Sequence, residues 1–166
     1  MSKQDALKGA HIFAGFEPAE LEALAAAATP ESATDGHVFV RMGEPNSRLY
    51  VVSSGTVLVE RMGTTAAVDL ARMRAGDTFG ELSFIDGSRA TATVRALGPA
   101  EVLAISHETL EQLLEKHPAL LGKFWQNMAL ELKRHLVLTN DLVDHYVDMN
   151  RVLVDNPELR DTLLWS

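Results

Sequence analysis

The sequence predicts an α+β protein built around an antiparallel β-roll of jelly-roll type. Short alternating segments separated by glycine-containing turns fill residues 36–105, a texture typical of antiparallel sandwiches and barrels. Apolar residues at helical spacing occupy residues 11–28 and 107–150, which favours helices on either side of the roll. We therefore expect one domain over residues 11–150 and a tail over 151–166.

Composition limits the function classes. The chain has 166 residues, of which 46% are hydrophobic and 23% charged, as in an ordinary soluble globular domain with its own core. No apolar run is long enough to span a membrane, and the start does not resemble a signal peptide. There is no cysteine, so disulfides are excluded. We expect a cytoplasmic protein without membrane contact.

The net charge of −8 argues against nucleic acid as a direct partner. A negative field repels phosphates unless basic residues are segregated into a patch. The pair Lys133-Arg134 is isolated on a predicted helix, so we expect no direct DNA binding.

The N-terminal segment, residues 11–28, reads as a helix. Pro18 falls where a first helical turn would begin, and proline is well tolerated there. Leu21 and Leu24 share one face, and the alanine run that follows suits close packing against a roll.

Five segments between residues 36 and 105 read as strands because apolar and polar residues alternate and turn residues flank them. They are His37–Arg41, Leu49–Val52, Thr56–Arg61, Ala67–Met73 and Glu101–Ile105.

The C-terminal region reads as two helices. Residues 108–116 form an amphipathic helix that stops at His117-Pro118, because the residue before proline avoids the α region. A longer helix runs from Ala119 to about Asn150. Its spacing by threes and fours gathers a heptad stripe that is longer than a small roll can cover. We expect part of it to form a homodimer seam, with Met128, Leu132, Thr139, Leu142 and Tyr146.

Residues 79–94 carry the most informative motif. Gly80 allows close approach or a positive φ, a short apolar turn follows, and Asp86-Gly87-Ser88 closes that turn. Arg89 then heads an alternating run, Ala90–Val94, that reads as a strand. Free amides with a nearby guanidinium and hydroxyl form a small anion site. A tight turn with a surface arginine is the simpler alternative.

This stretch resembles the phosphate-binding cassette of cyclic nucleotide-binding domains, found in catabolite activator proteins, protein kinase A regulatory subunits and nucleotide-gated channels. The matching residues are Gly80-Glu81-Leu82-Ser83 and Ala92-Thr93-Val94, and Gly43, Gly55 and Gly76 fall at the turns of that family's roll. The resemblance covers about residues 11–150. It implies a short cassette helix in which the Gly-Glu-Leu opening cradles the cyclic phosphate and the glutamate binds the ribose 2′-hydroxyl. The ligand-binding candidates are Gly80, Glu81, Leu82, Ser83, Arg89, Ala90 and Thr91.

The arginine is displaced from the family's pattern. Four positions before Val94, where the resemblance places the phosphate-binding arginine, stands Ala90, and Arg89 comes one place earlier. In an extended segment a shift of one residue turns the side chain to the opposite face, although a bulge would turn it back. Along the long helix, His135 and Leu136 take the places of the base-contacting hydroxyls of catabolite activators.

Two functions remain open on these residues. The first is a cyclic nucleotide sensor for cyclic AMP or a similar ligand, with no other cofactor required. The second is a degenerate domain that binds no cyclic nucleotide and serves as a dimerising interaction module for an unknown protein partner. The histidines are scattered and no catalytic motif is present, so we expect neither a metal site nor an enzyme. Residues 151–166 are too few for a helix-turn-helix domain, which suggests a stand-alone sensor or scaffold.

Overall fold

The computed structural model describes residues 2–63 and 66–155, without the side chains of residues 142, 146, 149, 150 and 152–155. It divides into two units, residues 1–131 and 132–166. The longest helix, α5 (Pro118–Asp155), begins in the first unit and continues into the second. Among the described residues, the strands and the other helices belong to the first unit.

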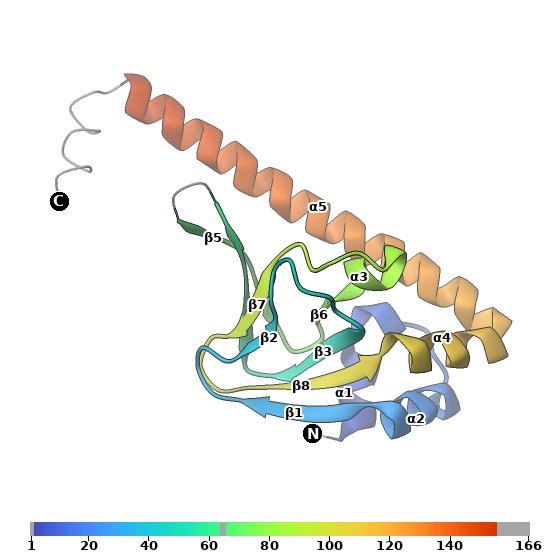
Figure 1. Cartoon of the computed structure of the whole chain (residues 1–166). Helices are drawn as coiled ribbons and strands as arrows, with labels where there is room; N and C mark the ends of the chain where they lie inside the picture. The colour runs from blue at the N-terminus through green and yellow to red at the C-terminus, as the bar shows by residue number, and fades with distance from the viewer. Residues whose placement is uncertain (1, 64–65, 156–166) are drawn as a thin grey trace. The chain divides into compact units, whose positions relative to one another are not determined.

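Within the described residues, eight strands form two four-stranded antiparallel sheets (Figure 1). The first sheet has the order β1-β8-β3-β6, with β1 (Thr29–Ala33), β8 (Ala100–Ser106), β3 (Arg48–Ser54) and β6 (Thr78–Phe79). The second has the order β2-β7-β4-β5, with β2 (Val38–Val40), β7 (Thr93–Ala96), β4 (Thr56–Met62) and β5 (Ala67–Arg74). The two sheets make the predicted α+β roll.

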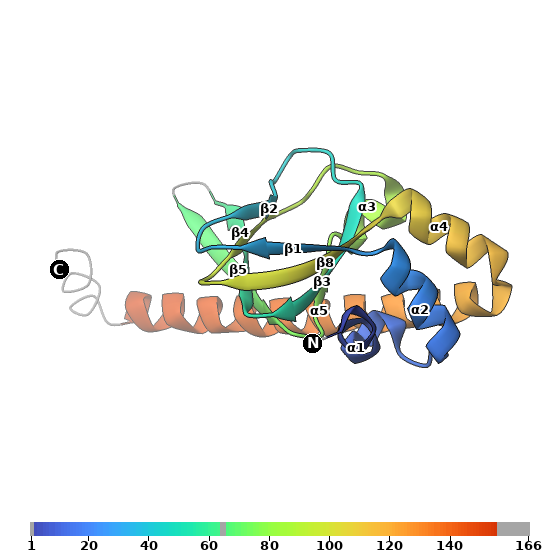
Figure 2. The same cartoon turned by 90° about the horizontal axis from the view of Figure 1, so that it is seen from below.

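Short helices lie at one end of the roll (Figures 1 and 2). The N-terminal elements are α1 (Lys3–Gly9), the 3₁₀ turn η1 (His11–Phe13) and α2 (Pro18–Ala27), and Figure 2 shows α1 and α2 side by side. A single helix, α3 (Glu81–Asp86), lies between β6 and β7, and α4 (His107–Lys116) follows β8 directly. The fold class predicted from the sequence is therefore confirmed.

The five predicted strands are confirmed, each within about two residues of its expected ends. The single helix expected over residues 11–28 is wrong. Gly15 adopts a φ of 76° and separates η1 from α2, which begins at Pro18 as expected. Helix α1 was not predicted; Ser2 caps it by accepting a hydrogen bond from the backbone N–H of Asp5. The two-residue strand β6 is too short to show an alternating pattern.

An apolar cluster drawn from both sheets fills the roll. It contains Val40, Tyr50, Val52, Val57, Met73, Phe79, Ala90, Val94, Ala96, Ala100, Val102 and Ala104. Tyr50 lies opposite Phe79 in the β3–β6 ladder, and their rings stack with centroids 4.7 Å apart. Since side chains alternate across a strand, the next pair of this ladder, Val51 and Thr78, points to the opposite face of the first sheet.

A second core lies where the start of α5 meets the N-terminal turn. Phe124 is completely buried, and its ring contacts those of Phe13 and Phe84 at centroid distances of 6.3 and 5.5 Å. Polar contacts add to this packing: Lys123 Nζ donates to the Gly15 carbonyl at 2.8 Å, and the Asn127 amide donates to carbonyls of the same turn. Residues 118–131 of α5 are thus anchored in the first unit.

We expect Phe124→Ala to lower the free energy of unfolding by about 3–5 kcal/mol, the usual cost of truncating a buried phenylalanine. Leu121→Ala, at a half-exposed site on the same helix, should cost clearly less. Urea unfolding of both variants measures the difference. Equal losses would show that the aromatic cluster contributes no more than the helix surface.

Candidate functional site

Residues 80–91, here called the cassette, connect the first sheet to the second. Gly80 begins the cassette with a φ of 86°, and Gly87 ends α3 with a φ of 67°. A Cβ at position 80 would stand 2.4 Å from the Arg48 carbonyl oxygen, so this position requires glycine for both conformation and space. At the far end of α3, the Ser88 amide donates to Asp86 Oδ1 at 2.9 Å and closes the turn.

The candidate ligand residues of the cassette face different ways. Glu81 and Ser83 are 6% and 4% exposed, whereas Leu82 between them is 42% exposed. Thr91 is exposed at the far end. A buried carboxylate and a buried hydroxyl on one short turn, with an exposed leucine between them, give this segment a polar inner side.

Arg89 and Ala90 lie on opposite sides of the chain. The Arg89 side chain is exposed and donates from Nη1 to the Gly43 carbonyl at 2.9 Å. Ala90 is 7% exposed and belongs to the apolar cluster inside the roll. The main chain is paired here, because the Ala90 N–H donates to the Glu44 carbonyl and its own carbonyl accepts from Gly43. The inward position therefore carries a methyl group where a guanidinium was expected from the resemblance.

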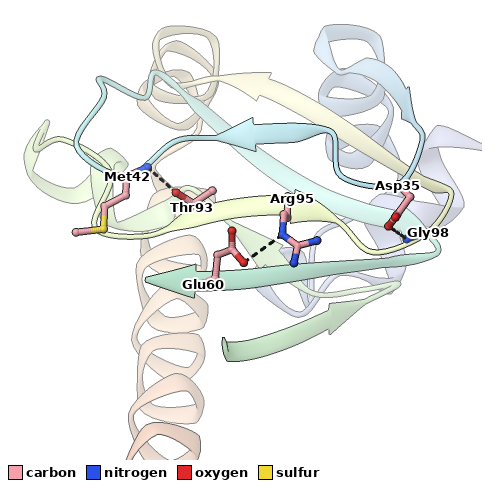
Figure 3. Close-up of polar contacts among 6 residues, drawn as sticks. All are labelled: Asp35, Met42, Glu60, Thr93, Arg95 and Gly98. Atoms are coloured by element: carbon pink, nitrogen blue, oxygen red, sulfur yellow. Dashed lines mark hydrogen bonds and ion pairs between the residues drawn. The ribbon is translucent and has the colours of Figure 1, made fainter. Parts of the chain in front are cut away.

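Strand β7, which leaves the cassette, is held by polar contacts on its outer side (Figure 3). The Met42 amide donates to Thr93 Oγ1 at 3.0 Å. Two residues further along β7, Arg95 pairs with Glu60 of β4 at 3.1 Å. These contacts fix the strand on which the cassette ends.

Comparison with known proteins identifies the family of this domain. The family model described as "Cyclic nucleotide-binding domain" matches residues 30–117, which include most of the roll, the cassette and α4. The chain belongs to the cyclic nucleotide-binding domain family. A domain of this family is a regulatory, ligand-sensing module, and the matched region contains residues 80–91.

Several relatives span the same region. A CRP-like cAMP-activated global transcriptional regulator of Mycobacterium tuberculosis is 29% identical over 139 residues, which are 83% of this chain and 61% of the relative. The N-terminal domain of a transcriptional regulator from Streptomyces coelicolor is 30% identical, with a TM-score of 0.69 over 84% of this chain and 95% of that one. The regulatory domain of Toxoplasma gondii PKA, solved with cAMP, is 30% identical, with a TM-score of 0.63 over 73% of this chain and 47% of that one. The chain thus spans less than two thirds of the first curated relatives' length.

Two residues beside the cassette were not predicted from the sequence. The Asn46 side chain reaches the carbonyl of Gly80, 34 positions away, and the His107 ring packs edge-on against Phe84 of α3 at 5.1 Å. Sequence spacing carries no signal for either contact, since each depends on how the loop after β2 and the start of α4 meet the cassette in three dimensions.

His107 has a buried ring nitrogen beside the cassette. Its Nε2 is buried without a hydrogen-bond partner. Burial lowers the pKa of His107. The backbone groups of Arg48 and Gly80 and the negative charge of Glu111 favour the protonated ring, and they offset that shift only in part. A neutral ring is therefore favoured next to the cassette.

The base-contacting candidates belong to the second unit. Leu136 is 61% exposed and His135 is half-buried. Since the units are described separately, contact of either side chain with a base stays a prediction.

The expected dimer residues differ in their exposure. Met128 is buried in the first unit, Leu132 is half-buried and Thr139 is exposed. The side chains of Leu142 and Tyr146 lie outside the described residues. Large apolar side chains are instead exposed on α5 at Leu130, Leu136, Val137, Leu138, Val143 and Val147.

Other site classes find no support in the described part of the chain. Its acidic and histidine side chains do not gather in groups of three or more that could bind a metal ion. None of its helices combines the length and the apolar character that crossing a membrane requires.

We expect His107 to destabilise the domain at acidic pH. Because its folded-state pKa lies below the ordinary histidine value of 6.5, the unfolded chain binds more protons than the folded chain as the pH falls below about 6.5, and unfolding becomes easier. The melting temperature of the wild type should drop more between pH 7.5 and pH 5.5 than that of His107→Gln. An identical drop in both proteins would contradict a perturbed His107.

Proposed function

We propose that this domain is a sensor of cyclic AMP or a closely similar cyclic nucleotide. The observation that carries the proposal is the cassette, in which Gly80 has the required left-handed conformation and Glu81 and Ser83 turn inward. The carboxylate of Glu81 is the ribose acceptor, and Gly80, Leu82, Ser83, Ala90 and Thr91 surround the phosphate. Support for cAMP comes from relatives named as cAMP-activated or solved with cAMP.

The phosphate still needs a positive partner, and Arg89 is the one that we propose. A guanidinium pairs with a phosphate through two parallel hydrogen bonds. To form them, Arg89 must release the Gly43 carbonyl that it contacts in this structure. That exchange removes one hydrogen bond for each ligand bound, so the affinity should be lower than that of a domain with a preset inward arginine.

A second candidate function follows from Ala90. Its methyl group continues the apolar cluster of the roll, and a phosphate next to it would lie in a setting that penalises an unpaired charge. On this alternative the domain binds no cyclic nucleotide and acts as a dimerising module for a protein partner. In either case we propose that this domain has no catalytic activity of its own, does not bind nucleic acid directly and resides in the cytoplasm.

We propose a homodimer through α5, with a seam that differs from the predicted one. Leu132, Leu136, Thr139 and Val143 follow spacings of four, three and four along the helix, as the a and d positions of a coiled coil do. Leu136 and Val143 are more than half exposed. Since Met128 is already buried within its own chain, the stripe through Leu136 and Val143 is the better candidate for contact with a second copy.

Calorimetric titration of nucleotide-free protein with cyclic AMP and then cyclic GMP tests the ligand. We expect saturable binding of one of them, and Arg89→Ala should weaken it about a hundredfold, or about 3 kcal/mol. Ala90→Arg supplies the guanidinium at the inward position and should bind at least as tightly as the wild type.

The two variants separate the alternatives. Unchanged affinity in Arg89→Ala would remove that residue from the site. No binding by the wild type, with binding by Ala90→Arg, would mean that the cassette keeps its shape and that the native domain acts without nucleotide.

The seam is tested by Val143→Glu, which places a charge on the proposed contact stripe and should convert a dimer into a monomer on a sizing column with light scattering. Leu138→Glu is the matched control, since Leu138 is equally exposed on the same helix but lies on a different face. If Val143→Glu remained a dimer, or if Leu138→Glu also became a monomer, the result would argue against this seam.

A further inference from the structure

The loop of residues 43–46 contacts both ends of the cassette. At the start, Asn46 Nδ2 donates to the Gly80 carbonyl at 3.4 Å and to the Arg48 carbonyl at 2.8 Å. The same side chain accepts from the Arg48 amide through Oδ1 at 3.3 Å. One half-buried side chain thus connects the loop, the first residue of β3 and the first residue of the cassette.

The other end of the cassette is held by the loop's main chain. The Gly43 N–H donates to the Ala90 carbonyl at 2.8 Å, and the Ala90 N–H donates to the Glu44 carbonyl at 2.9 Å. Pro45 and Arg89 form an isolated antiparallel bridge beside them. These bonds do not depend on side-chain identity, so Asn46 is the loop side chain whose substitution releases only the start of the cassette.

The start of the cassette is a crowded place. Gly80 packs so closely that an added Cβ would lie 2.4 Å from the Arg48 oxygen and 2.9 Å from Asn46 Nδ2. The Asn46 amide donates to the carbonyls of both Gly80 and Arg48, and without it both acceptors lose a donor in a half-buried site. The position of Gly80 therefore depends on the hydrogen-bonding character of Asn46.

We infer that Asn46 is a positioning residue that holds the cassette in the geometry needed for ligand binding. It does not contact the ligand; it fixes Gly80, and through Gly80 the orientation of Glu81 and of the first turn of α3. The effect on ligand affinity rests on the proposed function, whereas the effect on the cassette itself does not. A consequence is that ligand binding and order in the loop of residues 43–46 are coupled.

Asn46→Asp is the sharpest test because it is nearly isosteric. It keeps Oδ1 as the acceptor for the Arg48 amide and removes both donations, so the local turn survives while the link to the cassette is lost. Ser47→Ala, next in the chain, is the matched control: its side chain has no role in these contacts, and its carbonyl still accepts from the His107 amide. Hydrogen–deuterium exchange is measured on nucleotide-free protein, together with calorimetric affinity for cyclic AMP.

We expect exchange of residues 84–87, whose amides are paired within α3 and at its end, to become at least tenfold faster in Asn46→Asp, with residues 100–106 of β8 unchanged, and affinity for cyclic AMP to fall about tenfold. Ser47→Ala should match the wild type in both. Unchanged cassette exchange in Asn46→Asp would overturn the inference, and so would faster exchange throughout β8, which would make Asn46 a residue of general stability. A wild type that binds no nucleotide would refute the proposed ligand, while cassette exchange would still decide the role of Asn46.

Discussion

The close approach of Gly80 to the carbonyl of Arg48 governs how the two sheets of this domain are joined. At this point the chain leaves β6, which is paired with β3, and turns into α3 before it enters β7 of the other sheet. Only a residue without a Cβ and with a positive φ allows that turn at such a short distance. The position of the following cassette residues, 81–91, therefore depends on this contact.

The cassette is supported on two sides by different interactions. On one side Asn46 and the main chain of residues 43 and 44 pair with its polar backbone. On the other, Phe84 of α3 packs against Phe124 and Trp125 of α5 and against His107 of α4. A ligand that moves the cassette would therefore act on the start of α5 through aromatic packing, which is a direct physical route from the site to the helix.

The inner side of the cassette has no arginine at position 90 to pair with a phosphate. Inside the roll, Ala90 belongs to an apolar cluster, and the nearest guanidinium in sequence is exposed and bonded to Gly43. An anion entering here exchanges water for a largely neutral surface, which is costly unless a donor moves toward it. In the function that we propose, nucleotide binding therefore depends on the release of Arg89 from the Gly43 carbonyl.

Helix α5 serves two different roles along its length. Its first turns are built into the core by Phe124 and by the polar contacts of Lys123 and Asn127 with the N-terminal turn. Its later turns expose large aliphatic side chains such as Leu136 and Val143. An exposed apolar stripe is unfavourable in water, and burial against a second copy would remove that surface from water, which supports the homodimer that we propose.

The sequence by itself determined the roll, its turns and the cassette. Alternation, glycine positions and the Gly80–Ser83 motif are local properties that a reader can follow along the chain. It also predicted that Arg89 and Ala90 face opposite ways in the absence of a bulge, because the period of an extended segment is two. Tertiary structure alone decided which of the two faces inward, that Gly43 occupies the arginine, and that Asn46 and His107 flank the cassette. Those outcomes depend on contacts between segments tens of residues apart, and no pattern along the chain encodes which loop will pack against which turn.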